Sequence, residues 1–217
     1  MFMKFVDASA KIKDARLLCE LLDTFIQEVD PQNVVQVITD NVANYVATGG
    51  LLMERYPNLF WTPCVAHCID LMLEDIGKIP FVRDIVESSK SITKLIYNHA
   101  SVLSLVRRFT NNNELICYAI TQFATSFISL QSLLNSMWDV KTMFLSQEWC
   151  ALSIRCMLER EGICRLVSYD QSFWAGVEEV CAILEPFVRI LWLVDGYKPT
   201  MGYLYEAMDR AKEVICA

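Results

Sequence analysis

The chain has 217 residues, of which 54% are hydrophobic, and its 19 lysines and arginines against 26 aspartates and glutamates give a net charge of −7. Apolar runs such as Ile190–Val194 are far shorter than the roughly 18 residues of a membrane-spanning helix, so we expect no membrane partner. The acidic balance argues against DNA binding by this chain alone, because phosphate binding depends mostly on lysine and arginine. Nine cysteines, with no long apolar region at Met1–Asp7, predict reduced thiols in an intracellular protein.

The first part of the chain alternates short β-branched runs with helical patterns. Met1–Val6 is interpreted as a strand, and Lys11–Val29 as an amphipathic helix with Ser9 as a candidate N-cap. Val34–Ile38 has few polar breaks and is typical of a strand buried on both faces. Leu59–Thr62 is predicted to be a second such strand.

A helix is expected after each of these two strands. Asn41 is a plausible N-cap for the first helix, and Gly49 lies where a missing side chain would allow close approach to a sheet. The second helix follows Thr62 and carries an apolar stripe. Strand, helix, strand, helix is the order of a parallel α/β sheet. Such sheets place ligands at the carboxyl ends of their strands, where Asp40 lies. The face expected to be buried on the first helix carries Val42, Tyr45, Val46, Met53 and Tyr56.

After Gly77–Pro80 the strand signals fade and helical periodicity dominates. Thr110–Asn113 is a polar turn, and Gly162–Tyr169 is interpreted as a connector that could hold a brief extended piece. Pro186 should kink or divide the helix that contains it. The expected helical segments are Phe81–Ile96, Val102–Phe109, Leu115–Glu161 with a break near Asn135–Met137, Ser172–Val194 and Met201–Ile215.

Tryptophans and cysteines at helical spacing among leucines favour core packing over base stacking or metal binding. The residues concerned are Trp138, Trp149, Trp174 and Trp192, with Cys19, Cys150, Cys156 and Cys181. Candidate basic patches are limited to Arg83, Lys90 and Lys94 on one helix and Arg107–Arg108 on the next.

The segment TDNVANYVATGGLLMERYPNLFWTPCVAHCIDLMLEDIG resembles the central catalytic segment of plant hAT-type transposases. The likeness continues through Gln122–Phe127, Ser172–Trp174 and Val194–Tyr203, and so covers nearly the whole chain. It implies a helix-dominated α/β fold: a partial ribonuclease-H-like core with a short, mainly parallel sheet in residues 1–79, and a large α-helical insertion in residues 80–217.

In that family three carboxylates cut DNA with metal ions, and Asp40 resembles the second of them. The first would precede Met1 and the third would follow Ala217, so the resemblance implies a chain truncated at both ends. Several carboxylates must converge to hold two cations. Asp40 is therefore expected to be a vestigial ligand, with no bound metal and no cofactor (ancestrally Mg²⁺ or Mn²⁺). Capping of the next helix by Asp40 is the alternative role.

Cys64 and His67 match the family's C-x2-H element, which lies near the DNA in relatives. Gln122 occupies a position where relatives usually have arginine, whose charged fork glutamine cannot reproduce. Cys68 could add a zinc ligand, but a closed site needs four and His99 is the other histidine. We therefore favour a partly buried His67 with one hydrogen bond.

These observations predict a transposase-derived fragment without catalytic activity, ancestrally a DNA-binding transposition protein. One alternative is a domesticated protein-interaction module that uses the helical region. Another is a metal-dependent DNA transposase or nuclease completed by missing segments. The expected partners are a second copy or another protein, with no small-molecule substrate, and the resemblance implies a nuclear location. An open strand edge left by truncation would promote self-association.

Overall fold

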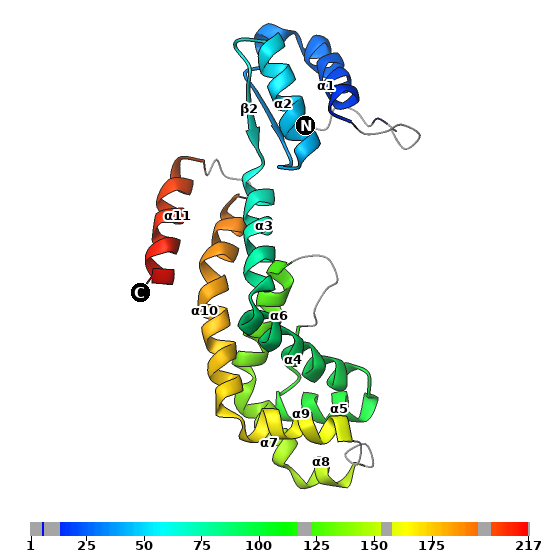
Figure 1. Ribbon diagram of the computed structural model, residues 1–217. Helices are drawn as coiled ribbons and strands as arrows, with labels where there is room; N and C mark the ends of the chain where they lie inside the picture. Colours follow the sequence, from blue (N-terminus) through cyan, green and yellow to red (C-terminus); the bar gives the residue numbers. More distant parts are fainter. Residues whose placement is uncertain (1–5, 7–13, 117–122, 153–157, 195–200, 217) are drawn as a thin grey trace. The chain divides into compact units, whose positions relative to one another are not determined.

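The computed structural model describes residues 6, 14–116, 123–152, 158–194 and 201–216 (Figure 1). The chain divides into two compact units, residues 1–69 and 70–217. Helix α3 (Val65–Lys78) spans the division. No helix in the described ranges is long and apolar enough to cross a membrane.

The first unit contains a two-stranded parallel sheet with helices α1 and α2 packed beside it. Each residue of β1 (Gln36–Thr39) is paired with one of β2 (Phe60–Pro63), from Gln36 with Phe60 to Thr39 with Pro63. This confirms the predicted neighbouring parallel strands, displaced by one or two residues, and the helix-dominated α/β class. The other elements of this unit are α1 (Ala15–Val29), the 3₁₀ turn η1 (Pro31–Asn33) and α2 (Ala43–Arg55).

The prediction that the Val34–Ile38 strand is buried on both faces is wrong. Val35 is 69% exposed and Ile38 is 56% exposed. Val34 and Val37 instead pack against a small core between α1, α2 and the sheet. In the described part of the chain the sheet has two strands, so one face of β1 contacts the helices and the other faces solvent. The buried centre of this core is Cys19, Ile26, Leu52 and Leu59.

The start of α1, and both the start and the buried face of α2, differ from the expectation. Asp14, and not Ser9, caps α1 by accepting a hydrogen bond from the Leu17 amide at 2.8 Å. Val42, and not Asn41, occupies the N-cap of α2. The buried positions of α2 are Thr48, Gly49 and Leu52, whereas Val42, Val46 and Met53 are exposed. The expected Met1–Val6 strand and Ser9 lie outside the described residues, apart from Val6, which is not in a strand.

Gly49 confirms the predicted close approach between α2 and the sheet. A Cβ atom at residue 49 would lie 2.3 Å from Cγ of Trp61, which belongs to β2. The Trp61 indole also donates a hydrogen bond to Oγ1 of Thr39 in β1, at 2.9 Å. One side chain therefore connects both strands and the helix that joins them.

We predict that Gly49→Ala lowers the free energy of unfolding of the first unit by about 1–3 kcal/mol, because the added methyl group overpacks against the indole. The measurement is urea unfolding followed by tryptophan fluorescence. Gly50→Ala is the matched control, because a Cβ there meets nothing within 4 Å. That change should be neutral or stabilise the helix by up to about 1 kcal/mol. Equal effects of the two substitutions would contradict the prediction.

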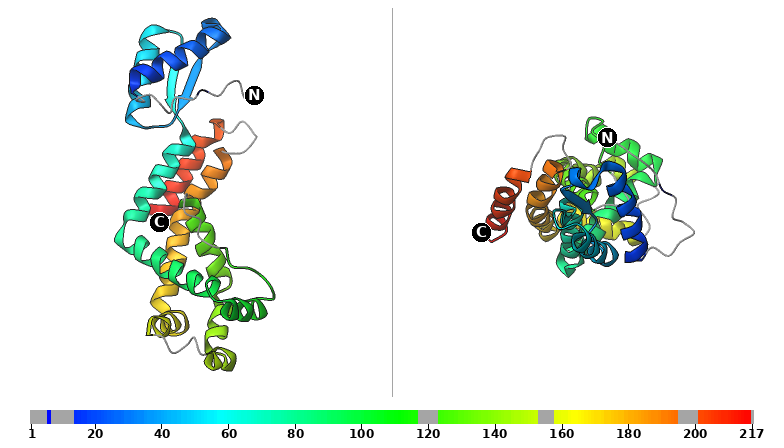
Figure 2. Two further views of the ribbon diagram at one scale, coloured as in Figure 1. Left: turned by 90° about the vertical axis from the view of Figure 1, so that its right-hand side faces the viewer. Right: turned by 90° about the horizontal axis from the view of Figure 1, so that it is seen from above.

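All the regular secondary structure in the described residues of the second unit is helical (Figures 1 and 2). Its longest helix, α10, packs against α4, α6, α9 and α11, while α5 and α7 pack against one another. The elements are α4 (Pro80–Tyr97), α5 (Ala100–Phe109), α6 (Phe123–Asn135), α7 (Met137–Leu145), α8 (Gln147–Ala151), α9 (Leu158–Tyr169), α10 (Gln171–Val194) and α11 (Met201–Cys216).

Most of the expected helices are confirmed, as are the break at Ser136 and the turn predicted at Thr110–Asn113, which the structure places at residues 110–112. Asn111 and Asn112 of that turn adopt φ angles of 53° and 64°, a conformation that asparagine tolerates better than most residues. The prediction of a connector at Gly162–Tyr169 is wrong, because these residues form most of α9. Burial of Val167 offsets the cost of a glycine in that helix. Leu115 and Ile116 are not helical.

The predicted core roles hold for some tryptophans and cysteines and fail for others. Trp149 and Trp174 are buried, but Trp138 is 72% exposed and Trp192 is 55% exposed. Both exposed indoles lie on the solvent-facing side of their helices. Helical spacing among apolar residues does not by itself show which side of a helix faces solvent. Cys19 and Cys181 are buried, whereas Cys150 is exposed. Cys156 lies outside the described residues.

Candidate functional site

The carboxyl edge of the two-stranded sheet gathers the residues that the sequence singled out. Thr39 pairs with Pro63 at the ends of β1 and β2, so Asp40 and Cys64 follow at the same edge. The Cys64 amide donates a hydrogen bond to the Thr39 carbonyl at 2.7 Å, which extends the pairing by one residue. Helix α3 begins directly afterwards at Val65. The predicted position of Asp40 is confirmed, and its side chain is exposed.

Asn41 has a different role from the predicted helix cap. Its side chain forms a hydrogen bond with the Cys68 thiol in the first turn of α3. Burial raises the pKa of Cys68, and the neighbouring Cys64 raises it further, while the bond with Asn41 acts in the opposite direction. The hydrogen bond between Asn41 and Cys68 therefore links the end of β1 to the first turn of α3.

His67 lies on the same turn of α3 and is half-buried, as expected. Its Nε2 atom is buried and has no hydrogen-bond partner among the described residues. A buried ring nitrogen without a partner costs free energy, because it has lost the water that it would otherwise contact. The edge thus holds one exposed carboxylate and one buried imidazole nitrogen.

This set of donors does not fit a two-metal centre. No group of three or more histidine, cysteine, aspartate or glutamate side chains converges within the described residues. Two cations about 4 Å apart need several carboxylates between them, and Asp40 supplies one. Gln122, the other residue expected near DNA, lies outside the described residues.

A second polar cluster, which the sequence analysis missed, joins α1 to the end of α2. Tyr56 donates a hydrogen bond to Oδ1 of Asp23, and Gln27 donates one to the Tyr56 hydroxyl at 2.7 Å. Arg55 forms an ion pair with Asp23 at 3.0 Å. The hydrogen bond from Tyr56 lowers the pKa of Asp23 and raises the pKa of Tyr56. Asp23 and Tyr56 are 33 residues apart, and no local pattern connects them.

The directions of these pKa changes set a pH window for the stability of the cluster. Because the pKa of Asp23 is lowered in the folded chain, its carboxylate stabilises the fold above the ordinary aspartate pKa near 3.9. This stabilisation is lost as the pH falls through the pKa that Asp23 has in the folded chain. Because the pKa of Tyr56 is raised in the folded chain, its protonated hydroxyl stabilises the fold below about pH 10. This stabilisation is lost as the pH rises through the pKa that Tyr56 has in the folded chain. The cluster therefore contributes fully between about pH 4 and pH 10.

We predict that Tyr56→Phe lowers the urea midpoint of the first unit at pH 7 and that this deficit shrinks below about pH 4, where Asp23 becomes protonated. Unfolding of the two chains across this pH range provides the measurement. Tyr45→Phe removes the same atom from a tyrosine within α2 that is not among the described partners of Asp23, and it is the matched control. A deficit that does not change with pH would show that the hydroxyl acts independently of Asp23.

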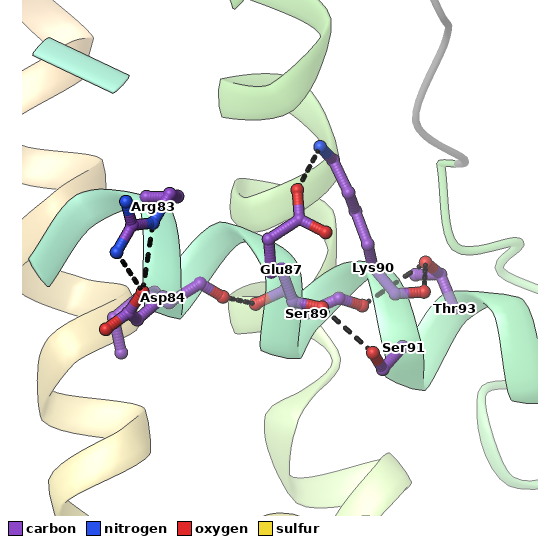
Figure 3. Close-up of polar contacts among 8 residues, drawn as sticks. Arg83, Asp84, Glu87, Ser89, Lys90, Ser91 and Thr93 are labelled. Atoms are coloured by element: carbon purple, nitrogen blue, oxygen red, sulfur yellow. Dashed lines mark hydrogen bonds and ion pairs between the residues drawn. The ribbon is translucent and has the colours of Figure 1, made fainter. Parts of the chain in front are cut away.

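Four of the five basic residues in the candidate patches, all but Lys94, contact a nearby carboxylate in the described residues. On α4, Arg83 contacts Asp84 at 3.2 Å and Lys90 contacts Glu87 at 2.7 Å (Figure 3). On α5, Arg107 pairs with Glu114, and Arg108 lies 3.6 Å from Glu148. These exposed pairs add little stability. They do reduce the positive potential that a DNA backbone would meet.

The second unit also contains an apolar groove of about 470 Å³ between α10 and α11. Two arginines stand on its walls, and each pairs with a glutamate four residues earlier on its own helix, at 2.5 Å. The groove is lined by Ala182, Glu185, Pro186, Arg189, Ile190, Leu193, Ala207, Arg210 and Ala211.

Residues 1–92 match the model of a family described as Domain of unknown function (DUF659), a transposase-associated domain family of plants. The match includes both strands, the sheet edge with Asp40 and His67, and most of α4. No curated protein and no solved structure matches the chain. The amino-terminal part of this chain is therefore similar to a transposase-related domain.

Proposed function

We propose that this chain is an hAT-type transposase-derived protein that does not cut DNA on its own. The observation that supports this is the composition of the sheet edge. Asp40 is the carboxylate that the resemblance assigns to the ancestral metal site, and it belongs to no group of three or more possible metal ligands within the described residues. One carboxylate cannot hold and orient two cations for phosphoryl transfer.

Weak DNA binding by this chain alone is part of the same proposal. The net charge is −7, and four residues of the candidate patches on α4 and α5 are paired with carboxylates: Arg83, Lys90, Arg107 and Arg108. Since non-specific affinity for DNA comes from neutralised phosphates, each paired cation contributes less to it. A nuclear location follows from the resemblance alone and belongs to this proposal.

A domesticated protein-interaction module is the second candidate, and the helical unit supplies the observation that favours it. Large aromatic side chains on its surface are exposed: Trp138, Tyr169, Trp192, Tyr203 and Tyr205. Tyrosine and tryptophan are enriched in protein interfaces, because one side chain provides both apolar area and a polar tip. A helical unit with such a surface is suited to binding proteins.

We predict that the purified chain, incubated with Mg²⁺ or Mn²⁺ and supercoiled DNA, produces no nicking that depends on Asp40. The measurement compares the chain with Asp40→Ala on agarose gels, and Asp139→Ala provides an exposed aspartate control on α7. Gln122→Arg alone should not create activity, because it supplies no carboxylate. Nicking by the unmodified chain that disappears in Asp40→Ala and persists in Asp139→Ala would instead support a metal-dependent nuclease.

A further inference from the structure

Two free cysteines lie one helical turn apart at the carboxyl edge of the sheet. The Cys68 amide donates a hydrogen bond to the Cys64 carbonyl at 3.0 Å, so the two residues have the backbone relation of positions i and i+4 in a helix. Both side chains are half-buried, and both thiols are free. The other free cysteines in the described part of the chain lie on separate helices. The sheet edge therefore carries a pair of thiols, not two isolated ones.

The backbone brings this pair within reach of a disulfide. One helical turn of four residues separates two Cα atoms by about 6 Å, and disulfides span Cα separations of about 4.4–6.8 Å. The Cβ atoms of such a pair are about 5–6 Å apart, so they must approach by about 1–2 Å to reach the roughly 4 Å of a disulfide. Cys64 precedes Val65, the first residue of α3, so the helix does not fix its backbone angles. Cys64 can therefore make this small movement while the rest of α3 stays in place.

Each of the two cysteines also holds α3 to the end of β1. The Cys64 amide donates a hydrogen bond to the Thr39 carbonyl at 2.7 Å. The Cys68 side chain forms a hydrogen bond with Asn41, which follows the same strand. A movement of Cys64 towards Cys68 would lengthen the first bond, and a disulfide would replace the thiol that Asn41 contacts. The oxidation state of the pair is therefore coupled to the attachment of α3 to the sheet edge.

We propose that Cys64 and Cys68 are a redox-active pair, which a peroxide converts into an intramolecular disulfide and a small dithiol returns to the reduced form. This inference goes beyond the proposed function and does not depend on it. Protein disulfides that form in a reducing compartment are usually transient and serve catalysis or redox sensing. Oxidation of this pair would act on the sheet edge directly, because both cysteines bond to the end of β1.

The two oxidation steps balance with hydrogen peroxide as the oxidant. Burial raises the pKa of Cys68, so little of its thiol is ionised at neutral pH and the first step is assigned to Cys64. The Cys64 thiolate attacks one peroxide oxygen and breaks the O–O bond, which gives a sulfenic acid and, after protonation of the other oxygen, water. The Cys68 sulfur then attacks the Cys64 sulfur, and the displaced hydroxyl leaves with the Cys68 proton as a second water. Two electrons pass from the sulfur atoms to the peroxide.

One tryptic peptide reports on the pair, because Tyr56–Lys78 contains Cys64 and Cys68 and no other cysteine. The reduced, unmodified chain is treated with hydrogen peroxide, its remaining thiols are blocked with N-ethylmaleimide, and the digest is analysed by mass spectrometry. We expect this peptide to lose both maleimide labels and to become lighter by two hydrogen atoms. Dithiothreitol added before blocking should restore both labels. The Cys64 amide should exchange its hydrogen about tenfold faster in the oxidised chain, because its bond to Thr39 is weakened.

Cys64→Ser and Cys68→Ser should each abolish the disulfide, and in Cys68→Ser dimedone should trap the sulfenic acid on Cys64. The matched control is Cys150→Ser, which removes an exposed cysteine on α8 and should leave the disulfide unchanged. Retention of both labels in the unmodified chain, under conditions that oxidise Cys150, overturns the proposal whether or not the variants fold. A disulfide from either residue to any other cysteine also overturns it. Neither result bears on DNA cleavage, which the Asp40 experiment tests separately.

Discussion

The first unit depends on the close packing of the Trp61 indole against the backbone of Gly49. Gly49 has no Cβ, and the Trp61 indole occupies that space against α2 while its N–H reaches Thr39 on the neighbouring strand. Two strands of four residues each would be marginal by themselves. Clamped by the indole, they hold a fixed parallel register, and this register brings Asp40 and Cys64 to one edge.

The edge that this register creates carries one carboxylate, and no group of three or more possible metal ligands forms there within the described residues. Asp40 is exposed to solvent, the Cys68 thiol is hydrogen-bonded to Asn41, and His67 has a buried nitrogen without a hydrogen-bond partner among the described residues. Position and chemistry have separate causes here. The strand order places a carboxylate at the edge, whereas metal binding would need further carboxylates from other elements. A carboxylate can therefore lie at the strand end without a metal-binding site around it.

Local patterns in the sequence predicted the elements well, because periodicity and turn residues act over a few positions. Val34–Ile38, the helix of α4 and the need for a small residue at Gly49 could all be anticipated this way. The exposure of Ile38 could not be predicted from local patterns, because it depends on how many strands and helices cover the sheet. The contact of Asp23 with Tyr56 was equally hidden, because it joins residues 33 positions apart.

Pro186 has a consequence for the backbone of α10. The helix continues through it, yet proline has no N–H, so the carbonyl oxygen of Ala182 four residues earlier lacks its usual intrahelical donor. Both residues line the groove beside α11. The groove wall therefore includes a main-chain acceptor in a largely apolar setting. Water can satisfy this carbonyl while the groove is open, and a polar side chain that enters could replace that water without any change in the path of the helix.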